Sequence, residues 1–262
     1  MLICIRLPAI TVSLAVRVLA PVMWLAMIVT LMIAAQPAGF KAVASQEKSN
    51  PNDLIATAAQ KGKQLAEALH GYTYYAELTL QTVSQADVIT GKYFRFSQLS
   101  YDRDGNRQER VFETTSTLPK EAHIGTNAAY NLIRVYQFII TPETLNHYEL
   151  NFVGREKIDE LNTYVFDVKP KAKMPDPEKS HERYLKGRVW IDDQDLQVVK
   201  VAGQALPEQS AHRTPKFETY FQNYDQYWFP AYTTADDEIR VGNRLSRVIV
   251  KVRFTSYKKV NN

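Results

Sequence analysis

At residues 72–81 the chain reads YTYYAELTLQ, a stretch in which apolar and more polar side chains alternate. The apolar set is Tyr74, Ala76, Leu78 and Leu80. Successive side chains of a β-strand point to opposite faces, so this period of two predicts a strand with one buried face. We therefore expect the fold to be built on a sheet that is covered on one side.

Similar segments follow at short intervals as far as the C-terminus. They are Tyr93–Ser97, Arg107–Thr115, His147–Val153, Thr163–Lys169, Glu182–Asp192, Gln197–Gln204, Lys216–Tyr224, Trp228–Ile239 and Leu245–Tyr257. Turn-forming residues lie between several of them, at Asp102–Asn106, Asp192–Asp195, Asn223–Asp225 and Gly242–Asn243. The pattern predicts nine or ten antiparallel strands in one long meander.

Two helices are predicted beside these strands. The first begins at Asn52 or Asp53, has small and aliphatic residues at helical spacing, and ends at His70-Gly71. The second lies within Thr126–Ile140. A large antiparallel sheet twists and tends to close. The predicted fold class is therefore mainly β (α+β): a curved antiparallel sheet forming a half-open barrel, with the helices covering its concave face.

The N-terminal segment has the layout of an export signal. Arg6 and Arg17 precede an apolar run, residues 18–35, and Ala42 and Ala44 stand at a small-x-small cleavage pattern. Residues 1–44 are therefore predicted to be a signal peptide, 45–50 a spacer and 51–262 a single domain. The run is also close to the roughly 20 residues that span a bilayer, so an uncleaved inner-membrane anchor is the alternative.

Charge and cysteine content narrow the function classes for the exported part. Residues 1–44 hold Arg6, Arg17 and Lys41 and no acid, so the formal charge of +4 falls to +1 without them. This removes the main support for nucleic-acid binding. The only cysteine is Cys4, so the exported part has no disulfide or thiol chemistry.

Motifs for catalysis or metal binding are not found in the sequence. The five histidines are dispersed, and no H-E-x-x-H, G-x-S-x-G or phosphate-binding glycine loop occurs. The stretch that begins at Asp102–Asn106 lacks the glycine at the sixth position and the glutamate that closes the twelve-residue loop of a calcium site, so it is read as a hairpin turn. Asp192, Asp193 and Asp195 are read as a solvated turn. We expect no enzyme activity, no cofactor and no metal.

Aromatic and aliphatic residues on the predicted strands indicate an apolar groove instead. Sites for acyl chains are mostly apolar walls with a few polar groups. The candidate groove residues are Leu78, Leu80, Phe94, Phe96, Tyr164, Phe166, Ile191, Phe217, Phe221, Val250, Val252 and Phe254. Ile133 and Tyr136 of the second helix are candidates for a lid over the groove. A plain closed core is the alternative interpretation.

Three blocks of sequence resemble a known superfamily. They are residues 72–78 after the opening helix, residues 148–170 followed by Gly187–Asp192, and Tyr227–Tyr232 before the final strand. In order and spacing they are similar to the periplasmic outer-membrane lipoprotein-carrier and sorting superfamily, the LolA-like proteins, of which the chain resembles a divergent member. The resemblance implies a half-open barrel that carries or senses lipid or lipoprotein acyl chains. It also implies an arginine that latches the lid, for which Arg95 is the nearest candidate by strand position.

These observations predict an exported periplasmic protein that binds lipid or lipoprotein acyl chains, in outer-membrane lipoprotein sorting or envelope maintenance. The expected partners are these acyl chains and envelope membrane proteins, with no nucleic acid, and the oligomeric state stays open. The alternative function is an envelope sensor or interaction domain that is tethered to the inner membrane and carries nothing.

Overall fold

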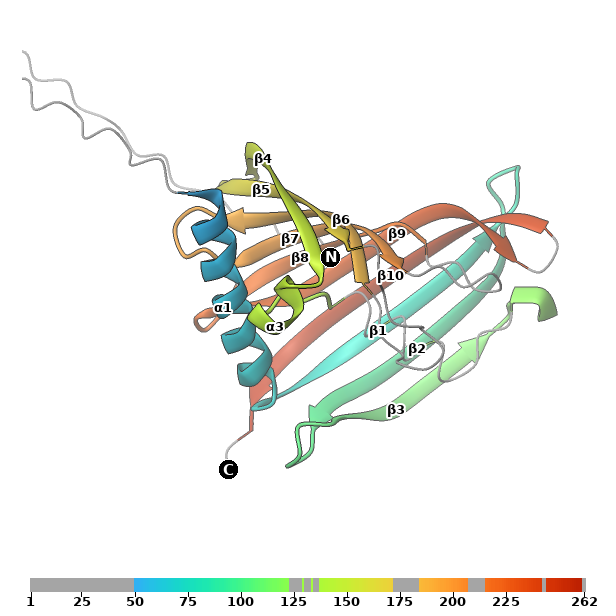
Figure 1. Cartoon of the computed structure of the whole chain (residues 1–262). Coiled ribbons are helices and arrows are strands. Elements are labelled where there is room, and N and C mark those ends of the chain that lie inside the picture. The colour runs from blue at the N-terminus through green and yellow to red at the C-terminus, as the bar shows by residue number, and fades with distance from the viewer. Residues whose placement is uncertain are drawn as a thin grey trace, which may run out of the picture. The chain divides into compact units, whose positions relative to one another are not determined.

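The fold is known from a computed structural model that describes residues 50–122, 129, 133, 137–171, 184–206, 215–241 and 244–260. Residues 48–262 form one compact unit. Figure 1 shows a long helix beside a broad, curved sheet. Within the described part of the chain, no helix is both long and apolar enough to cross a bilayer.

Helix α1, Pro51–Leu69, begins where the sequence predicts. The Asn50 side chain caps it by accepting the backbone N–H of Asn52, and Pro51 occupies the first helical position, where no N–H is needed. Its buried stripe is Leu54, Ile55, Ala58, Ala59, Gly62, Leu65 and Leu69. These residues recur every three or four positions, so one side of α1 packs against the sheet.

The ten strands form one antiparallel sheet. They are β1 Tyr72–Val83, β2 Ile89–Tyr101, β3 Arg107–Ser116, β4 Tyr148–Ile158, β5 Leu161–Pro170, β6 Tyr184–Asp192, β7 Val198–Leu206, β8 Phe217–Tyr224, β9 Tyr227–Val241 and β10 Arg244–Lys259. Their order is β3-β2-β1-β10-β9-β8-β7-β6-β5-β4. The prediction of one simple meander was therefore wrong. The last strand pairs with the first, and the chain crosses from one edge to the other between β3 and β4.

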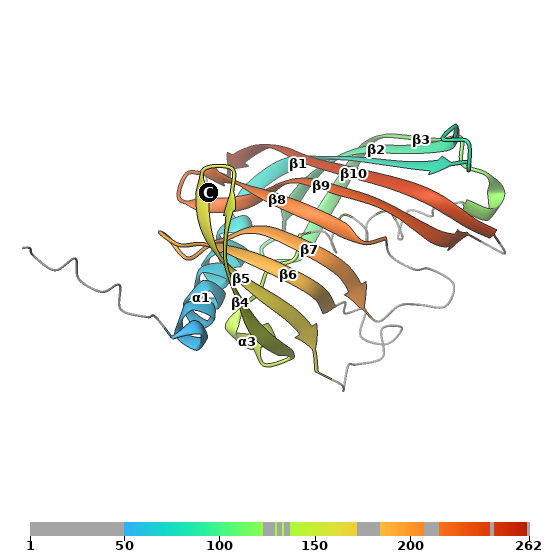
Figure 2. The ribbon, with the colours of Figure 1, turned by 90° about the horizontal axis from the view of Figure 1, so that it is seen from above.

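The sheet is curved and not closed, as the half-open barrel prediction required (Figure 2). The pairing of each edge strand has a register shift: that of β3 with β2 shifts between Phe96 and Ser97 of β2, and that of β4 with β5 shifts between Phe152 and Gly154 of β4. A bulge bends an edge strand and interrupts its hydrogen-bonding row, which discourages pairing with another chain. The fold therefore leaves two protected edges on either side of its concave face.

The core lies between α1 and the concave face of the sheet. Buried side chains from α1, from β1, β2 and from β5 to β10 form one continuous hydrophobic cluster. The second predicted helix is described only at Ala129 and Ile133, which are helical and fully buried. Its predicted end at Ile140 was wrong, because residues 137–140 are not helical. The short helix α3, Pro142–Leu145, which the sequence did not predict, follows them.

Candidate functional site

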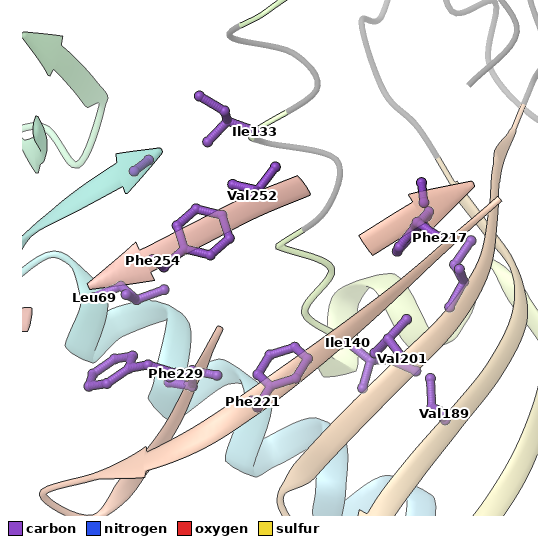
Figure 3. Close-up of a cluster of buried hydrophobic side chains, with 14 of the residues drawn as sticks. Leu69, Ile133, Ile140, Val189, Val201, Phe217, Phe221, Phe229, Val252 and Phe254 are labelled. Atoms are coloured by element: carbon purple, nitrogen blue, oxygen red, sulfur yellow. The ribbon is translucent and has the colours of Figure 1, made fainter. Parts of the chain in front are cut away.

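The concave face brings together ten of the twelve predicted groove residues. Figure 3 shows Phe217, Phe221, Val252 and Phe254 within this cluster. In β1 and β10, Leu78 lies opposite Val252 and Leu80 opposite Val250, so aliphatic side chains form a continuous strip across the two strands. The wall continues on β8 with Phe217 and Phe221, and on β5 and β6 with Tyr164, Phe166 and Ile191. Phe254 of β10 completes the set. Nine of these residues are at most 7% exposed, and Tyr164 is partly buried. In this structure they are core residues beneath a cover.

Phe94 and Phe96 do not belong to this face, and their placement in the groove was wrong. In β2 the buried residues are the alternate ones, including Tyr93, Arg95 and Ser97. The ring of Phe96 lies instead on the convex face, where its centroid is 5.4 Å from Tyr75 and 5.6 Å from Phe112. Neighbouring aromatic rings thus cover Phe96 outside the core, and the ammonium of Lys92 lies 5.9 Å from the ring centroid of Phe94.

The lid candidates have different outcomes. Ile133 is fully buried and belongs to the main cluster, so it packs against the concave face, while its role as a lid stays a prediction. Tyr136 lies outside the described residues. A second cover, which the sequence did not predict, is the segment 138–140: a Cβ at Gly62 of α1 would collide with the carbonyl oxygen of Ile140. Only glycine lets the segment approach the helix this closely.

A depression opens beside α1, next to this close approach. It is shallow: its cavity volume is only about 10 Å³, within a wider hollow of about 270 Å³ that includes open solvent. Its lining is Lys61, Gly62, Leu65, Phe138, Ile139, Ile140, Gln197, Val198, Phe221 and Trp228. We call this feature the α1 depression. Phe221 and Ile140 also belong to the concave cluster, so the depression adjoins the predicted groove.

A buried ion pair lies at the β2–β3 end of the concave face. Arg95 donates from Nε and Nη2 to the two carboxylate oxygens of Glu109 at 2.9 and 2.8 Å, and the two side chains are only 3% and 7% exposed. Burial alone would raise the pKa of Glu109, but the hydrogen bonds from Arg95 and Ser97 and the charges of Arg95 and Arg107 together outweigh it and hold this pKa below its usual value. The arginine that the resemblance singled out is thus bonded to its own sheet; a latch contact with a lid stays a prediction.

Tyrosine hydroxyls supply most of the other polar groups in the core. Gln137 donates to the hydroxyl of Tyr74 at 3.2 Å and accepts from Arg107 at 2.8 Å, which ties the segment before α3 to strands β1 and β3. Burial raises the pKa of Tyr148 to about 12, and it also raises the pKa of Tyr74 and Tyr257 above its usual value. These hydroxyls therefore stay protonated at neutral pH, so they leave the wall uncharged.

The acidic turn between β6 and β7 is less solvated than predicted. Asp192 is only 4% exposed and accepts the backbone N–H groups of Gln194 and Asp195. Burial raises its pKa above the usual value. Asp195 in turn accepts the indole N–H of Trp228 at 2.8 Å and the amide of Gln197. The carboxylates hold a hairpin together, and no group of three metal-ligating side chains is found in the described part of the chain.

Sequence reasoning missed several residues that line the concave side. Phe152 of β4 lies opposite Phe166, with ring centroids 5.2 Å apart, and is 38% exposed at the open edge. Its alternation with Tyr148 and Leu150 was a usable signal. Lys61, Phe138 and Trp228 could not have been assigned to one depression, because α1, a loop and β9 meet only in the folded chain.

Comparison with families and curated sequences gives one match. A family model whose description reads "Uncharacterized protein" matches residues 108–259, which is more than half of the chain. A search of curated protein sequences finds no match.

Solved structures with a similar fold were also found. A LolA superfamily protein from Nitrosomonas europaea is 10% identical, with 80% of this chain and 93% of that chain covered and a TM-score of 0.36. A DUF1329 family protein from Desulfovibrio piger is 9% identical, with 77% and 93% covered and a TM-score of 0.37. The lipoprotein LppX of Mycobacterium tuberculosis is 11% identical, with 81% and 99% covered and a TM-score of 0.29. All three TM-scores are below 0.5, so these likenesses carry no further argument, and the resemblance to the LolA-like superfamily stays a prediction.

Proposed function

The chain belongs to the family whose model matches residues 108–259, and we propose that it is an exported protein that binds the acyl chains of lipids or lipoproteins on its concave face. The observation that carries the proposal is this apolar wall. In the order of the sheet it extends from β1 through β10 and β8 to β5, and it includes Phe166, Phe217 and Phe221. Its described cover is α1, Ile133 and the segment 138–140.

The concave side is incompletely covered, which favours ligand binding rather than a permanently filled core. The concave side is exposed at the β4 edge, where Phe152 is 38% accessible, and at the β3 edge, where Val111 is 41% accessible. The α1 depression adds an opening beside the helix. A chain that entered at the β4 edge would meet Phe152 and then the ring of Phe166, whereas at the β3 edge it would pass the buried Arg95–Glu109 pair.

Energetics favour an acyl chain as the ligand. Each methylene that leaves water contributes about 0.8 kcal/mol, so a dozen would contribute roughly 10 kcal/mol before the cost of association. Binding of this kind needs no nucleotide and no chemical step. It therefore suits a protein that works outside the cytoplasm, where the leader at residues 1–44 directs it.

The second candidate is an inner-membrane-tethered sensor or interaction domain. The apolar run at residues 18–35 favours it, because its length approaches that of a membrane-spanning helix. N-terminal sequencing of the protein isolated from envelopes distinguishes the two functions. A start near Ser45 supports a freely diffusing carrier in lipoprotein sorting, whereas a start at Met1 or Met23 supports the tethered form.

The binding proposal is tested by titrating protein expressed from the complete sequence with a fluorescent long-chain fatty acid. We expect saturable binding in the micromolar range and competition by unlabelled fatty acid. Thr79→Ala, on the convex face beside Leu78, is the control and should bind as the wild type does. A folded protein without saturable binding would favour the sensor function.

A further inference from the structure

Lys61 is the one charged residue in the described lining of the α1 depression. Its side chain is partly buried and makes no ion pair or hydrogen bond with any described residue. Residues three and four positions away on a helix are neighbours, and here they are Thr57, Ala58, Gln64 and Leu65, none of them acidic. The helix itself therefore offers this ammonium no anion.

Lys63, two residues further along α1, is different. It is exposed and donates to Glu143 of α3 at 2.9 Å. The two lysines have the same chemistry and lie one turn apart or less, but only Lys63 has a carboxylate partner. The comparison provides a matched control, because a change at Lys63 alters the charge of α1 without touching the depression.

The polar group opposite Lys61 in this lining is already satisfied. Gln197 is 8% exposed, and its amide donates to Asp195 and to the carbonyl oxygen of Gln226 while it accepts the backbone N–H of Trp228. Asp195 receives hydrogen bonds from Trp228 and Gln197, and no ion pair within 4 Å joins it to Lys61. Lys61 is thus the group in this lining that is left for a ligand.

We propose that the α1 depression binds the head end of a single-chain amphiphile with an anionic head, a carboxylate or a phosphate. The head group accepts a hydrogen bond from Nζ of Lys61, and the first methylenes lie against Leu65, Phe138 and Phe221. A lysine keeps its aliphatic stem on an apolar wall while its ammonium reaches water, which suits the rim of such a site. The rest of the chain continues past Phe221 and Ile140 into the concave face. This inference rests on the proposed function and names its ligand class.

The test measures dissociation constants for three ligands of equal chain length: a fatty acid, an alkyl phosphate and a fatty alcohol. They are measured for the complete protein, for Lys61→Met, for Lys61→Arg and for the control Lys63→Met. We expect Lys61→Met to weaken binding of the acid and the phosphate by about tenfold, the order of one charge-assisted hydrogen bond at a partly exposed site. Alcohol binding should stay unchanged, Lys61→Arg should restore acid binding, and Lys63→Met should have no effect.

The outcomes separate this inference from the proposed function. If the wild type binds acid and alcohol but Lys61→Met weakens neither, or weakens both equally, the anionic-head site is wrong and acyl-chain binding stands. If the wild type binds none of the three ligands, both ideas are wrong. Loss of acid binding alone, or of phosphate binding alone, identifies which head group the site accepts.

Discussion

The concave and convex faces of the sheet are formed by alternate residues of the same strands, and they differ in burial and charge. On β10, Val248, Val250, Val252 and Phe254 are buried, whereas the alternate residues Arg247, Lys251 and Arg253 face outward. On the convex face charged residues form local pairs: Arg247 bonds Asp236, and Lys200 lies 4.8 Å from the ring centroids of both Trp190 and Tyr220. Beside them, Val165, Trp190 and Val199 form a second, smaller hydrophobic cluster. The comparison teaches that the depth at which a side chain is buried, and not its residue type alone, decides whether it packs in the core or makes a surface contact.

The largest expected difference between the faces comes from adding a charge. Val252→Asp places a carboxylate where the native side chain is 0% exposed, and no described cation lies opposite it on β1, where Leu78 stands. We expect a loss of more than about 4 kcal/mol in the free energy of unfolding, or no folded protein. Lys251→Asp, one residue away on the convex face, should change it by less than about 1 kcal/mol. Urea denaturation measures both; equal effects would contradict the assignment of the faces.

The buried pair Arg95–Glu109 is a polar exception on the concave side. Arg95→Met leaves the Glu109 carboxylate buried without its partner, so we expect a loss of about 3–5 kcal/mol. The double variant Arg95→Met/Glu109→Leu removes both charges and should recover most of that loss. A double variant as unstable as the single one would show that the pair stabilises the fold by more than the neutralisation of each charge by the other.

The same pair predicts a pH dependence. The pKa of Glu109 is below its usual value in the folded protein, so its contribution is complete above the unfolded pKa of about 4.3 and is lost as the pH falls through the folded value. Unfolding curves from pH 7 to pH 3 should therefore show a smaller loss of stability for the double variant than for the wild type. Parallel curves would contradict the depressed pKa.

A smaller effect is expected where α1 meets the cover. Gly62→Ala adds a methyl group that must displace the Ile140 carbonyl, which we expect to cost about 1–3 kcal/mol and to widen the α1 depression. Gly71→Ala is the control, because its Cβ would meet only Ala68 at 3.4 Å. Thermal unfolding and fatty-acid affinity are measured together; an unchanged melting temperature would show that the segment 138–140 moves freely.

The smallest effect belongs to the convex aromatic cluster. Phe96→Ala removes ring contacts with Tyr75 and Phe112 on a partly exposed surface, so we expect a loss of about 0.5–1.5 kcal/mol. Fatty-acid binding should be unchanged, because Phe96 is outside the concave face. A large loss of affinity would return Phe96 to the binding site.

Alternation in the sequence correctly assigned the faces of β1 and β10, where one set of residues is plainly apolar. It failed on β2, because Tyr93–Ser97 has aromatic residues on both faces and the usual preference puts Phe94 and Phe96 inside and Arg95 outside. The fold reverses this preference, since Glu109 of β3 neutralises Arg95 and neighbouring rings cover Phe96. The strand order and the α1 depression depend on contacts between distant segments, such as Gly62 with Ile140, and local patterns do not encode them.

The most direct test of acyl-chain binding is photolabelling with a fatty acid that carries a diazirine on its chain, followed by peptide mass spectrometry of the complete protein. Labels on α1, on residues 138–140 and on the concave residues of β7 to β9, suppressed by excess unlabelled fatty acid, are the predicted result. Labels on convex residues such as Phe96 and Phe112, or labelling that excess fatty acid does not suppress, would contradict a binding site on the concave face.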